Sequence, residues 1–356
     1  MGTPDRREMP CSRVRLRRLG EHLRASQTAP IAASEAVHAI VPYRRLSAED
    51  PTRLVYGGEG DDRDPRPHEM LDLRAAETSL LRDGFVMLPQ VSALDLAMLH
   101  QEPALYEDRE HVREVTAARA AYRLEMEALA HEAFERESEH VVFVVAGNGM
   151  FTRASRDIKA ARGEPPKHGE PGSMMLPIPA VVHSDLGFGH GMANNSGVPW
   201  QQDTPEFRRR LAEANVSFER LESCRHVIVQ TWRPITDHPV QRDPLAVLDP
   251  RTLRAEDLFS TGLNRSDPMG DDHGGRNAGR FVVYNPAHRW ALIPNQQRRE
   301  VLLFAGCDSG RDMYTQPLFH TSVTVPPPTE AEAAGRISVD VIVHCWLEES
   351  SSAAER

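Results

Sequence analysis

The sequence predicts a mainly β protein with flanking α-helices, folded as a sandwich or a barrel. Short runs rich in β-branched and aromatic residues follow one another between residues 141 and 346, and loops with proline and glycine separate them. A long stretch before these runs has the three- and four-residue spacing of a helix that packs on a sheet. Of the 356 residues 40% are hydrophobic, enough for one substantial core, so we expect a single elaborated domain.

The start of the chain differs in composition from the rest. Residues 1–53 are rich in arginine, proline, glycine and acidic side chains, so we expect a disordered or peripheral N-terminal arm. An organelle-targeting segment is the alternative for this arginine-rich start, although its acidic residues and its few serines weaken that interpretation. We expect the folded domain, with its N-terminal helices, at residues 54–348 and a flexible tail at residues 349–356.

Two helices are expected in the first half of the domain. Residues 74–82 have a helical pattern. Residues 115–137 carry one apolar stripe on an otherwise charged surface, formed by Ala118, Tyr122, Met126, Leu129 and Ala133. The expected strands span 84–89, 141–145, 180–185, 226–232, 281–284, 301–304, 319–325 and 337–346. Two long connections, 186–206 and 261–280, are rich in glycine and are expected to serve as lids or walls of a substrate site, with plain disorder as the alternative for the second.

Composition narrows the class of partner. The formal net charge is −10, which argues against nucleic acid as an obligatory partner because phosphate binding requires a dense basic surface. No stretch approaches the roughly 18 consecutive apolar residues that cross a bilayer, so we expect no membrane partner. The four cysteines are far apart in the sequence and predict reduced thiols in a cytoplasmic protein.

A triplet near the middle of the chain predicts a metal site. Side chains alternate along a strand, so His183 and Asp185 point to one side while Ser184 points away. A third ligand, His320, begins another β-compatible segment 135 residues after Asp185. Two imidazoles and one carboxylate can cover one face of Fe(II) and leave open positions, as in non-haem iron oxygenases. Four other histidines compete as ligands, namely His190, His226, His238 and His344.

A second motif follows the last predicted ligand. Arg336 and Ser338 lie 16 and 18 residues after His320 and share one face of a predicted strand, while the opposite face is apolar. The planar guanidinium of an arginine can hold the distal carboxylate of 2-oxoglutarate in a bidentate pair. Gln230, which shares a strand face with Trp232, and Tyr284 are further candidates for binding this cosubstrate.

Several segments together resemble a known family. These are Tyr284-Asn285-Pro286-Ala287-His288-Arg289-Trp290, Val301-Leu302-Leu303-Phe304, Cys307-Asp308-Ser309, Phe319-His320-Thr321, Trp232-Arg233-Pro234 and Pro244-Leu245-Ala246. They resemble the hydroxylase/desaturase family of secondary metabolism, which includes asperfuranone-type hydroxylases, a gibberellin desaturase and a component of cephamycin methoxylation. The similarity extends from about Leu54 to Trp346.

The resemblance implies a double-stranded β-helix, the cupin-like jelly roll of Fe(II)- and 2-oxoglutarate-dependent dioxygenases. His183, Asp185 and His320 would then be the metal ligands, with Arg336 and Ser338 at the cosubstrate. The implied reaction uses O2 and a ferryl-oxo intermediate to hydroxylate, desaturate or otherwise oxidise a small molecule, such as a natural product or an amino-acid-like compound. A homo-oligomer is compatible with this family.

Two other hypotheses stay open from the sequence. The first is a catalytically silent jelly-roll protein that supports another biosynthetic enzyme, although a silent protein could lose any of the three ligands. The second is a cupin-type metalloenzyme that does not use 2-oxoglutarate, which would leave Arg336 and Ser338 without a role.

Overall fold

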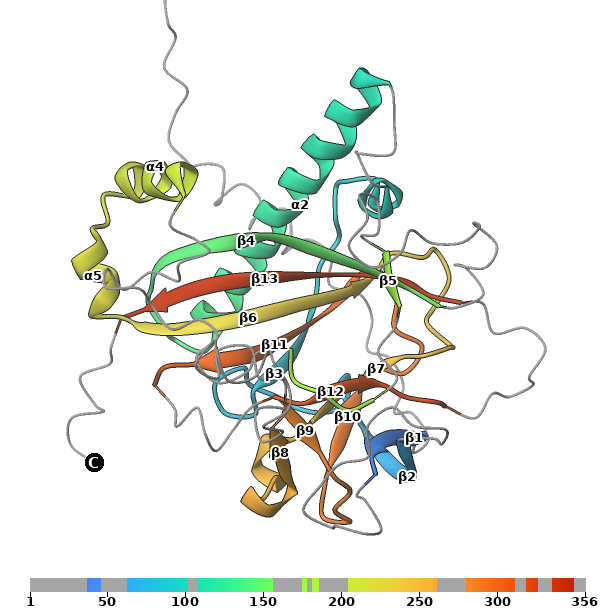
Figure 1. Cartoon of the computed structure of the whole chain (residues 1–356). Helices are drawn as coiled ribbons and strands as arrows, with labels where there is room; N and C mark the ends of the chain where they lie inside the picture. Colours follow the sequence, from blue (N-terminus) through green and yellow to red (C-terminus); the bar gives the residue numbers. More distant parts are fainter. Residues whose placement is uncertain are drawn as a thin grey trace, which may run out of the picture.

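The computed structural model describes residues 37–45, 63–101, 108–155, 175–177, 181–185, 204–260, 280–310, 318–325 and 335–348. Two sheets face each other in this part of the chain (Figure 1). The larger contains, in spatial order, β3 (Phe85–Pro89), β11 (Glu300–Asp308), β6 (Arg225–Pro234), β13 (Ile337–Leu347), β4 (Val141–Ala154) and β5 (Met175–Pro177). The smaller contains β1 (Val37–Arg44), β2 (Arg63–Asp72), β10 (Trp290–Leu292), β7 (Leu245–Leu248) and β12 (His320–Ser322).

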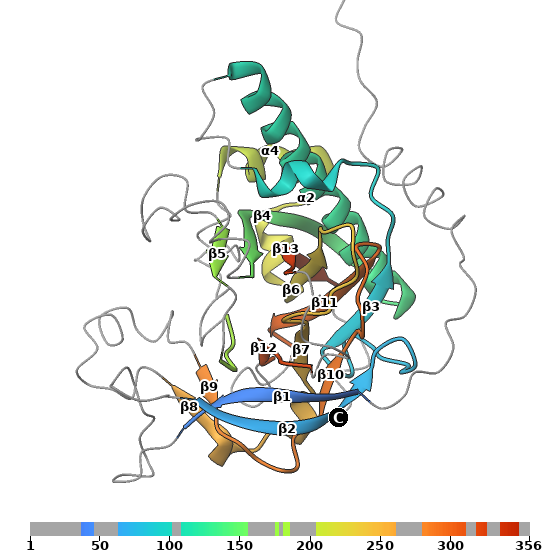
Figure 2. The same ribbon diagram turned by 90° about the vertical axis from the view of Figure 1, so that its right-hand side faces the viewer.

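The remaining elements lie around these sheets. Helix α2 (Arg109–Arg136) packs across the outer face of the larger sheet (Figure 2). The strand pair β8 and β9 lies beside the smaller sheet (Figure 1). The bounds are η1 (Leu96–His100), α4 (Pro205–Ala214), α5 (Phe218–Glu222), η3 (Pro250–Thr252), η4 (Ala255–Asp257), β8 (Leu258–Ser260) and β9 (Arg280–Val282). None of the helices in the described ranges is long and apolar enough to cross a membrane.

The two sheets contribute the two halves of a jelly roll, each built from four extended segments. The larger half is β4, β13, β6 and β11, and every neighbouring pair in it is antiparallel. The smaller half is β10, β7, β12 and the extended segment 181–185, which joins β12 through an antiparallel bridge between His183 and His320. From β6 onward the chain passes repeatedly between the two halves. The expected mainly β jelly-roll class is therefore confirmed.

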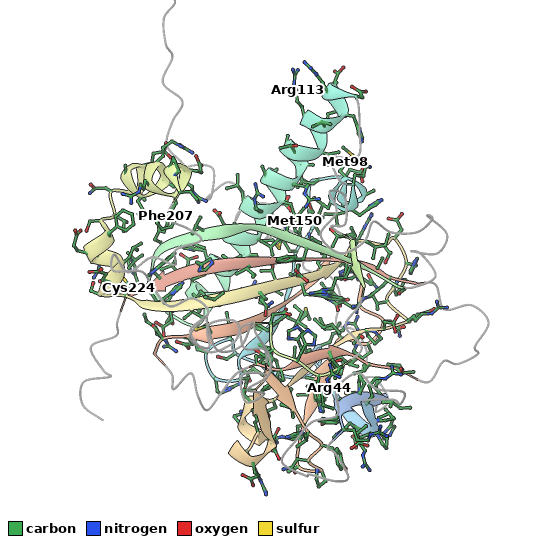
Figure 3. All side chains as sticks on the ribbon, viewed as in Figure 1. Arg44, Met98, Arg113, Met150, Phe207 and Cys224 are labelled. Atoms are coloured by element: carbon green, nitrogen blue, oxygen red, sulfur yellow. The ribbon has the colours of Figure 1, made fainter. Side chains whose placement is uncertain are left out.

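Side-chain alternation determines which residues of the larger sheet pack against α2 and which face the smaller sheet. On β13, Val339, Val341, Val343 and Cys345 are buried in the same cluster as four residues of the predicted apolar stripe of α2, namely Tyr122, Met126, Leu129 and Ala133. The structure thus confirms the predicted helix around residues 115–137 and its apolar face. The Asp108 side chain caps the start of this helix by accepting a hydrogen bond from the Glu110 N–H. Residues of opposite parity on β13 project into the space between the two sheets. Figure 3 shows that side chains occupy this space.

The inner core joins the two halves. It contains Trp232, Leu302 and Phe304 from the larger sheet and Leu245, Val247 and Ala291 from the smaller sheet. A separate apolar cluster covers the other face of the smaller sheet and includes Tyr43, Leu248, Trp290 and Phe319. Neighbouring residues therefore serve different cores, since Phe319 faces outward and the next residue, His320, faces the space between the sheets.

Residues 37–44 fall within the expected disordered or peripheral N-terminal arm and form the edge strand of the smaller sheet. These residues form β1, which pairs with β2 along its whole length and contains the fully buried Val41 and Tyr43. The strand is short and is followed by polar sequence, so composition alone did not reveal the distant partners that bury it. Residues 1–36, 46–62 and 349–356 lie outside the described residues, as do most of the two long connections predicted as lids.

The expected helix at residues 74–82 is wrong, because this stretch forms turns. Its backbone finds partners elsewhere: the Glu137 carboxylate accepts from the N–H groups of Leu80 and Leu81. Arg74 forms a bidentate pair with Glu300. These tertiary contacts satisfy the polar groups that a local helix would otherwise pair.

Tyr43 anchors β1 through its hydroxyl group. Trp290 Nε1 donates to this oxygen at 2.8 Å, and ring nitrogens of His68 and His288 lie 3.1 Å from it. We expect Tyr43→Phe to lower the free energy of unfolding by about 1–3 kcal/mol, because it leaves a buried indole N–H without its acceptor. Urea denaturation would measure this loss. Tyr284→Phe is the matched control, and an equal loss there would contradict a specific role for the Tyr43 hydroxyl.

Candidate metal centre

His183 and His320 come together because their backbones pair. The His183 N–H donates to the His320 carbonyl at 3.1 Å, and the His320 N–H donates to the His183 carbonyl at 3.0 Å. Residues directly opposite in an antiparallel pair project to the same side of the sheet. The two imidazole rings therefore lie side by side, with centroids 4.5 Å apart. Asp185, two residues beyond His183, projects to the same side as the alternation predicts.

The three predicted ligands form one cluster. One donor atom from each of His183, Asp185 and His320 lies within 4.8 Å of the others. Asp185 Oδ1 is 3.3 Å from His183 Nε2, and Asp185 Oδ2 is 3.2 Å from His320 Nε2. The carboxylate thus stands between two imidazole nitrogens, and among the described residues this is the one group with the composition and spacing of a metal site.

The hydrogen bonding of His183 suits a metal ligand. Its Nδ1 lies 2.8 Å from the Val181 carbonyl, an acceptor, so Nδ1 carries the proton and donates. The lone pair is then on Nε2, a buried atom that makes no hydrogen bond to any described residue. An unpartnered buried nitrogen is costly, and a divalent cation would satisfy it. The donor set of two imidazoles and a carboxylate fits Fe(II).

Electrostatics hold these groups in their metal-binding forms. Burial acts to raise the pKa of Asp185, but its interactions with the imidazoles of His320 and His183 hold that pKa well below its usual range. Burial lowers the pKa of His320, although Asp185 opposes this. A deprotonated carboxylate and a neutral imidazole are the forms that bind metal ions.

Gln230 supports the carboxylate from the opposite sheet. Its side-chain amide, on β6, donates to Asp185 Oδ2 at 2.8 Å. Loss of a group that orients a metal ligand typically costs 10- to 100-fold in metal affinity. We therefore expect Gln230→Ala to weaken Fe(II) binding by about 10- to 100-fold, as measured by anaerobic competition with a chromophoric chelator. The exposed Gln241→Ala is the matched control, and equal affinities for both variants would exclude an orienting role for Gln230.

Arg336 lies at the start of β13, with only 1% of its surface exposed. Its guanidinium carbon is 4.9 Å from the centre of the Trp232 ring, and Nη1 donates to the Asp243 carbonyl. Burial lowers the pKa of Arg336 to about 9, and the nearby Arg153 adds to this effect while acidic neighbours oppose it. Among the described residues, Arg336 Nε and the fully buried Ser338 Oγ have no hydrogen-bond partner. A buried cation with spare donors beside a hydroxyl group fits a carboxylate ligand.

The other candidates lie elsewhere. Tyr284 packs in the outer cluster, with its ring 5.5 Å from that of Tyr43, so the structure does not bring it together with the three ligands. His226 Nε2 and His344 Nδ1 lie 3.2 Å apart, while the half-buried His238 contacts the adjacent Pro239 carbonyl. His190 lies outside the described residues.

Sequence reasoning did not assign a role to two charged residues in the inner space. Asp340 follows Ser338 on the same face of β13, and Arg153 of β4 lies 3.4 Å from it. The alternation along β13 indicated the direction of Asp340, but only the register between β13 and β4 brings Arg153 to it.

Comparison with known proteins agrees with this geometry. Hydroxylase/desaturase CTB9 of Cercospora beticola is 31% identical over 111 residues, which cover 30% of this chain and 33% of that protein. Alpha-ketoglutarate-dependent dioxygenase tstK of Talaromyces stipitatus is 29% identical over 137 residues, covering 38% and 46%. Hydroxylase/desaturase asaB of Aspergillus flavus is 30% identical over 129 residues, covering 35% and 56%. Over these segments the chain is similar to the hydroxylase/desaturase proteins.

The predicted resemblance to these proteins is thereby confirmed, and the alignments span a third to somewhat over half of the relatives' own lengths. Residues 202–345 also match the family model described as Oxidoreductase/YMDC permease-like domain. Among solved structures, a variant of the iron and alpha-ketoglutarate-dependent endoperoxidase NvfI has a TM-score of 0.54. The match covers 88% of this chain and 98% of that one at 16% identity, and it supports the jelly-roll fold.

Proposed function

We propose that the protein is a non-haem Fe(II)- and 2-oxoglutarate-dependent dioxygenase that hydroxylates, desaturates or otherwise oxidises a small molecule. The observation that carries the proposal is the convergence of His183, Asp185 and His320, with the nitrogens of both histidines directed at the carboxylate. The burial of Arg336 and Ser338, each with a polar atom that has no partner among the described residues, supports a carboxylate site in the same inner space. The names of the relatives support the same chemistry.

Each residue has a defined task in this proposal. His183, Asp185 and His320 would hold Fe(II), which supplies the redox chemistry with O2 and 2-oxoglutarate. Gln230 keeps one oxygen of Asp185 in place through its hydrogen bond. Arg336 and Ser338 would hold the distal carboxylate of 2-oxoglutarate. Phe304, whose ring centroid is 5.0 Å from that of His320, forms an apolar wall that limits the access of water.

The substrate class remains part of the proposal. We propose a natural-product or amino-acid-like small molecule, and both hydroxylation and desaturation are within the capacity of such a site. Nucleic acid and membrane are not required by the proposed chemistry. A cytoplasmic location and self-association into a homo-oligomer are further parts of the proposal, to be tested by localisation and by size-exclusion chromatography with light scattering.

The deciding experiment is an anaerobic titration of the metal-free protein, first with Fe(II) and then with 2-oxoglutarate. We expect stoichiometric Fe(II) binding, followed by a weak visible charge-transfer band when the cosubstrate chelates the metal. Metal binding without this band would favour a cupin-type metalloenzyme that does not use 2-oxoglutarate. No metal binding at all would favour the catalytically silent partner.

A further inference from the structure

A second pair of charged residues lies in the inner space, outside the set to which the proposed function assigns a task. Arg153 Nε is 3.4 Å from Asp340 Oδ2, and the two side chains are only 17% and 10% exposed. Arg153 comes from β4 and Asp340 from the adjacent β13. A carboxylate held so far from solvent loses most of its hydration, so the charge on its partner matters more than in a surface pair.

Strand register places Asp340 between the metal ligands and Arg336. Asp340 lies opposite Trp232 on β6, and Trp232 carries the Arg336 guanidinium on its ring. The next position on the same face of β13, Ile342, lies opposite Gln230, which binds Asp185. Two residues along a strand span about 7 Å. Asp340 is therefore one such step from the row that supports the metal ligands and one step from Ser338.

The electrostatic effects agree with this placement. Burial raises the pKa of Asp340 to about 7, the charge of Asp185 also raises it, and the charges of Arg153 and Arg336 oppose both. Burial is the main reason that the pKa of Arg336 is low, and the charge of Arg153 contributes to this shift. Arg153 thus acts on both Asp340, which it contacts, and Arg336.

We propose that Arg153 is a positioning residue that neutralises Asp340, so that the inner space accepts the dicarboxylate 2-oxoglutarate. This inference rests on the proposed function. A dicarboxylate that reaches from the metal ligands to Arg336 passes the row occupied by Asp340. An unpaired carboxylate in that row repels the ligand in a medium of low dielectric constant, and the guanidinium of Arg153 cancels this repulsion.

The proposal is tested by a double-mutant cycle that measures 2-oxoglutarate binding. The readout is calorimetric titration of the Mn(II)-loaded protein, which reports affinity without turnover. With the titrations run well above neutral pH, where Asp340 is ionised, we expect Arg153→Met to weaken 2-oxoglutarate binding by about tenfold or more, because the Asp340 carboxylate is then unpaired. Near neutral pH the loss should be smaller, because removal of Arg153 raises the pKa of Asp340 and a protonated carboxyl does not repel the ligand. Asp340→Asn alone should bind at least as tightly as the wild type. The double variant should return to within about threefold of the wild type, because the repelling charge is gone.

Two further variants exclude simpler explanations. Arg153→Lys keeps the charge without the planar fork, and we expect its 2-oxoglutarate affinity to stay within about threefold of the wild type. Arg220→Met removes an arginine from a pair with Glu348 on the surface, and should leave binding unchanged. Circular dichroism and thermal unfolding of each variant identify any that do not fold.

The outcomes separate this inference from the proposed function. If the wild type binds 2-oxoglutarate and Asp340→Asn fails to restore the Arg153→Met variant, Arg153 contacts the ligand itself and the neutralising role is overturned. A large loss in Arg153→Lys points the same way, because only a direct contact requires the fork. If the wild type does not bind 2-oxoglutarate in the presence of Mn(II), the proposed function fails, and this inference fails with it.

Discussion

His183→Ala is expected to weaken Fe(II) binding by at least about 100-fold and to eliminate turnover, because it leaves two of the three protein ligands. Asp185→Ala should have an effect of the same size, since Asp185 lies within 3.3 Å of the nitrogens of both histidines. In that variant two neutral imidazoles remain, without the negative charge that balances a divalent cation. Anaerobic competition between the protein and a chromophoric chelator would measure the affinity.

His238→Ala is the matched control, because it removes a half-buried histidine that is not part of the three-residue cluster. It should bind Fe(II) as the wild type does. His183 and Asp185 are only 15% and 26% exposed at their side chains, so thermal unfolding should accompany the titrations. Normal activity in folded His183→Ala or Asp185→Ala protein would overturn the assignment of the metal ligands.

Local periodicity was enough to predict the parts of the fold that have one polar and one apolar face. On β13 the residues Val339, Val341 and Val343 alternate with polar residues, and the structure packs them against α2 as expected. The His-x-Asp spacing predicted two side chains on one face for the same reason. Side chains two apart on an extended segment share a face whatever the rest of the fold does, so His183 and Asp185 could be paired before the structure was known.

The sequence could not supply the contacts that depend on distant partners. Tyr43 lies in a short polar-flanked segment, and the side chains of His288 and Trp290 that bury its hydroxyl come nearly 250 residues later. Gln230 was predicted to bind the cosubstrate, whereas its observed partner is Asp185. That contact follows from how β6 lies over the segment 181–185. Register between strands from different sheets is not encoded in the alternation of either one.

Arg336→Ala is expected to raise the 2-oxoglutarate concentration needed for half-saturation by about 100-fold or more, while Fe(II) binding stays close to that of the wild type. The guanidinium is buried against Trp232, and its Nε has no hydrogen-bond partner among the described residues. A carboxylate that binds there forms charge-assisted hydrogen bonds in a site with little competing water. Arg336→Lys should recover only part of the affinity, because a lysine cannot form the bidentate pair.

The comparison of Arg336→Ala with two other variants separates a cosubstrate role from a structural one. Arg336 Nη1 also donates to the Asp243 carbonyl, so part of any loss could come from a less stable β13. Ser338→Ala removes only the unpartnered Oγ and preserves the strand, and we expect it to weaken 2-oxoglutarate binding by about tenfold. Arg298→Ala, which breaks an exposed pair with Asp237, should change nothing. Full turnover by Arg336→Ala without added dependence on 2-oxoglutarate would instead identify a cupin-type metalloenzyme, because such an enzyme has no use for a buried carboxylate site.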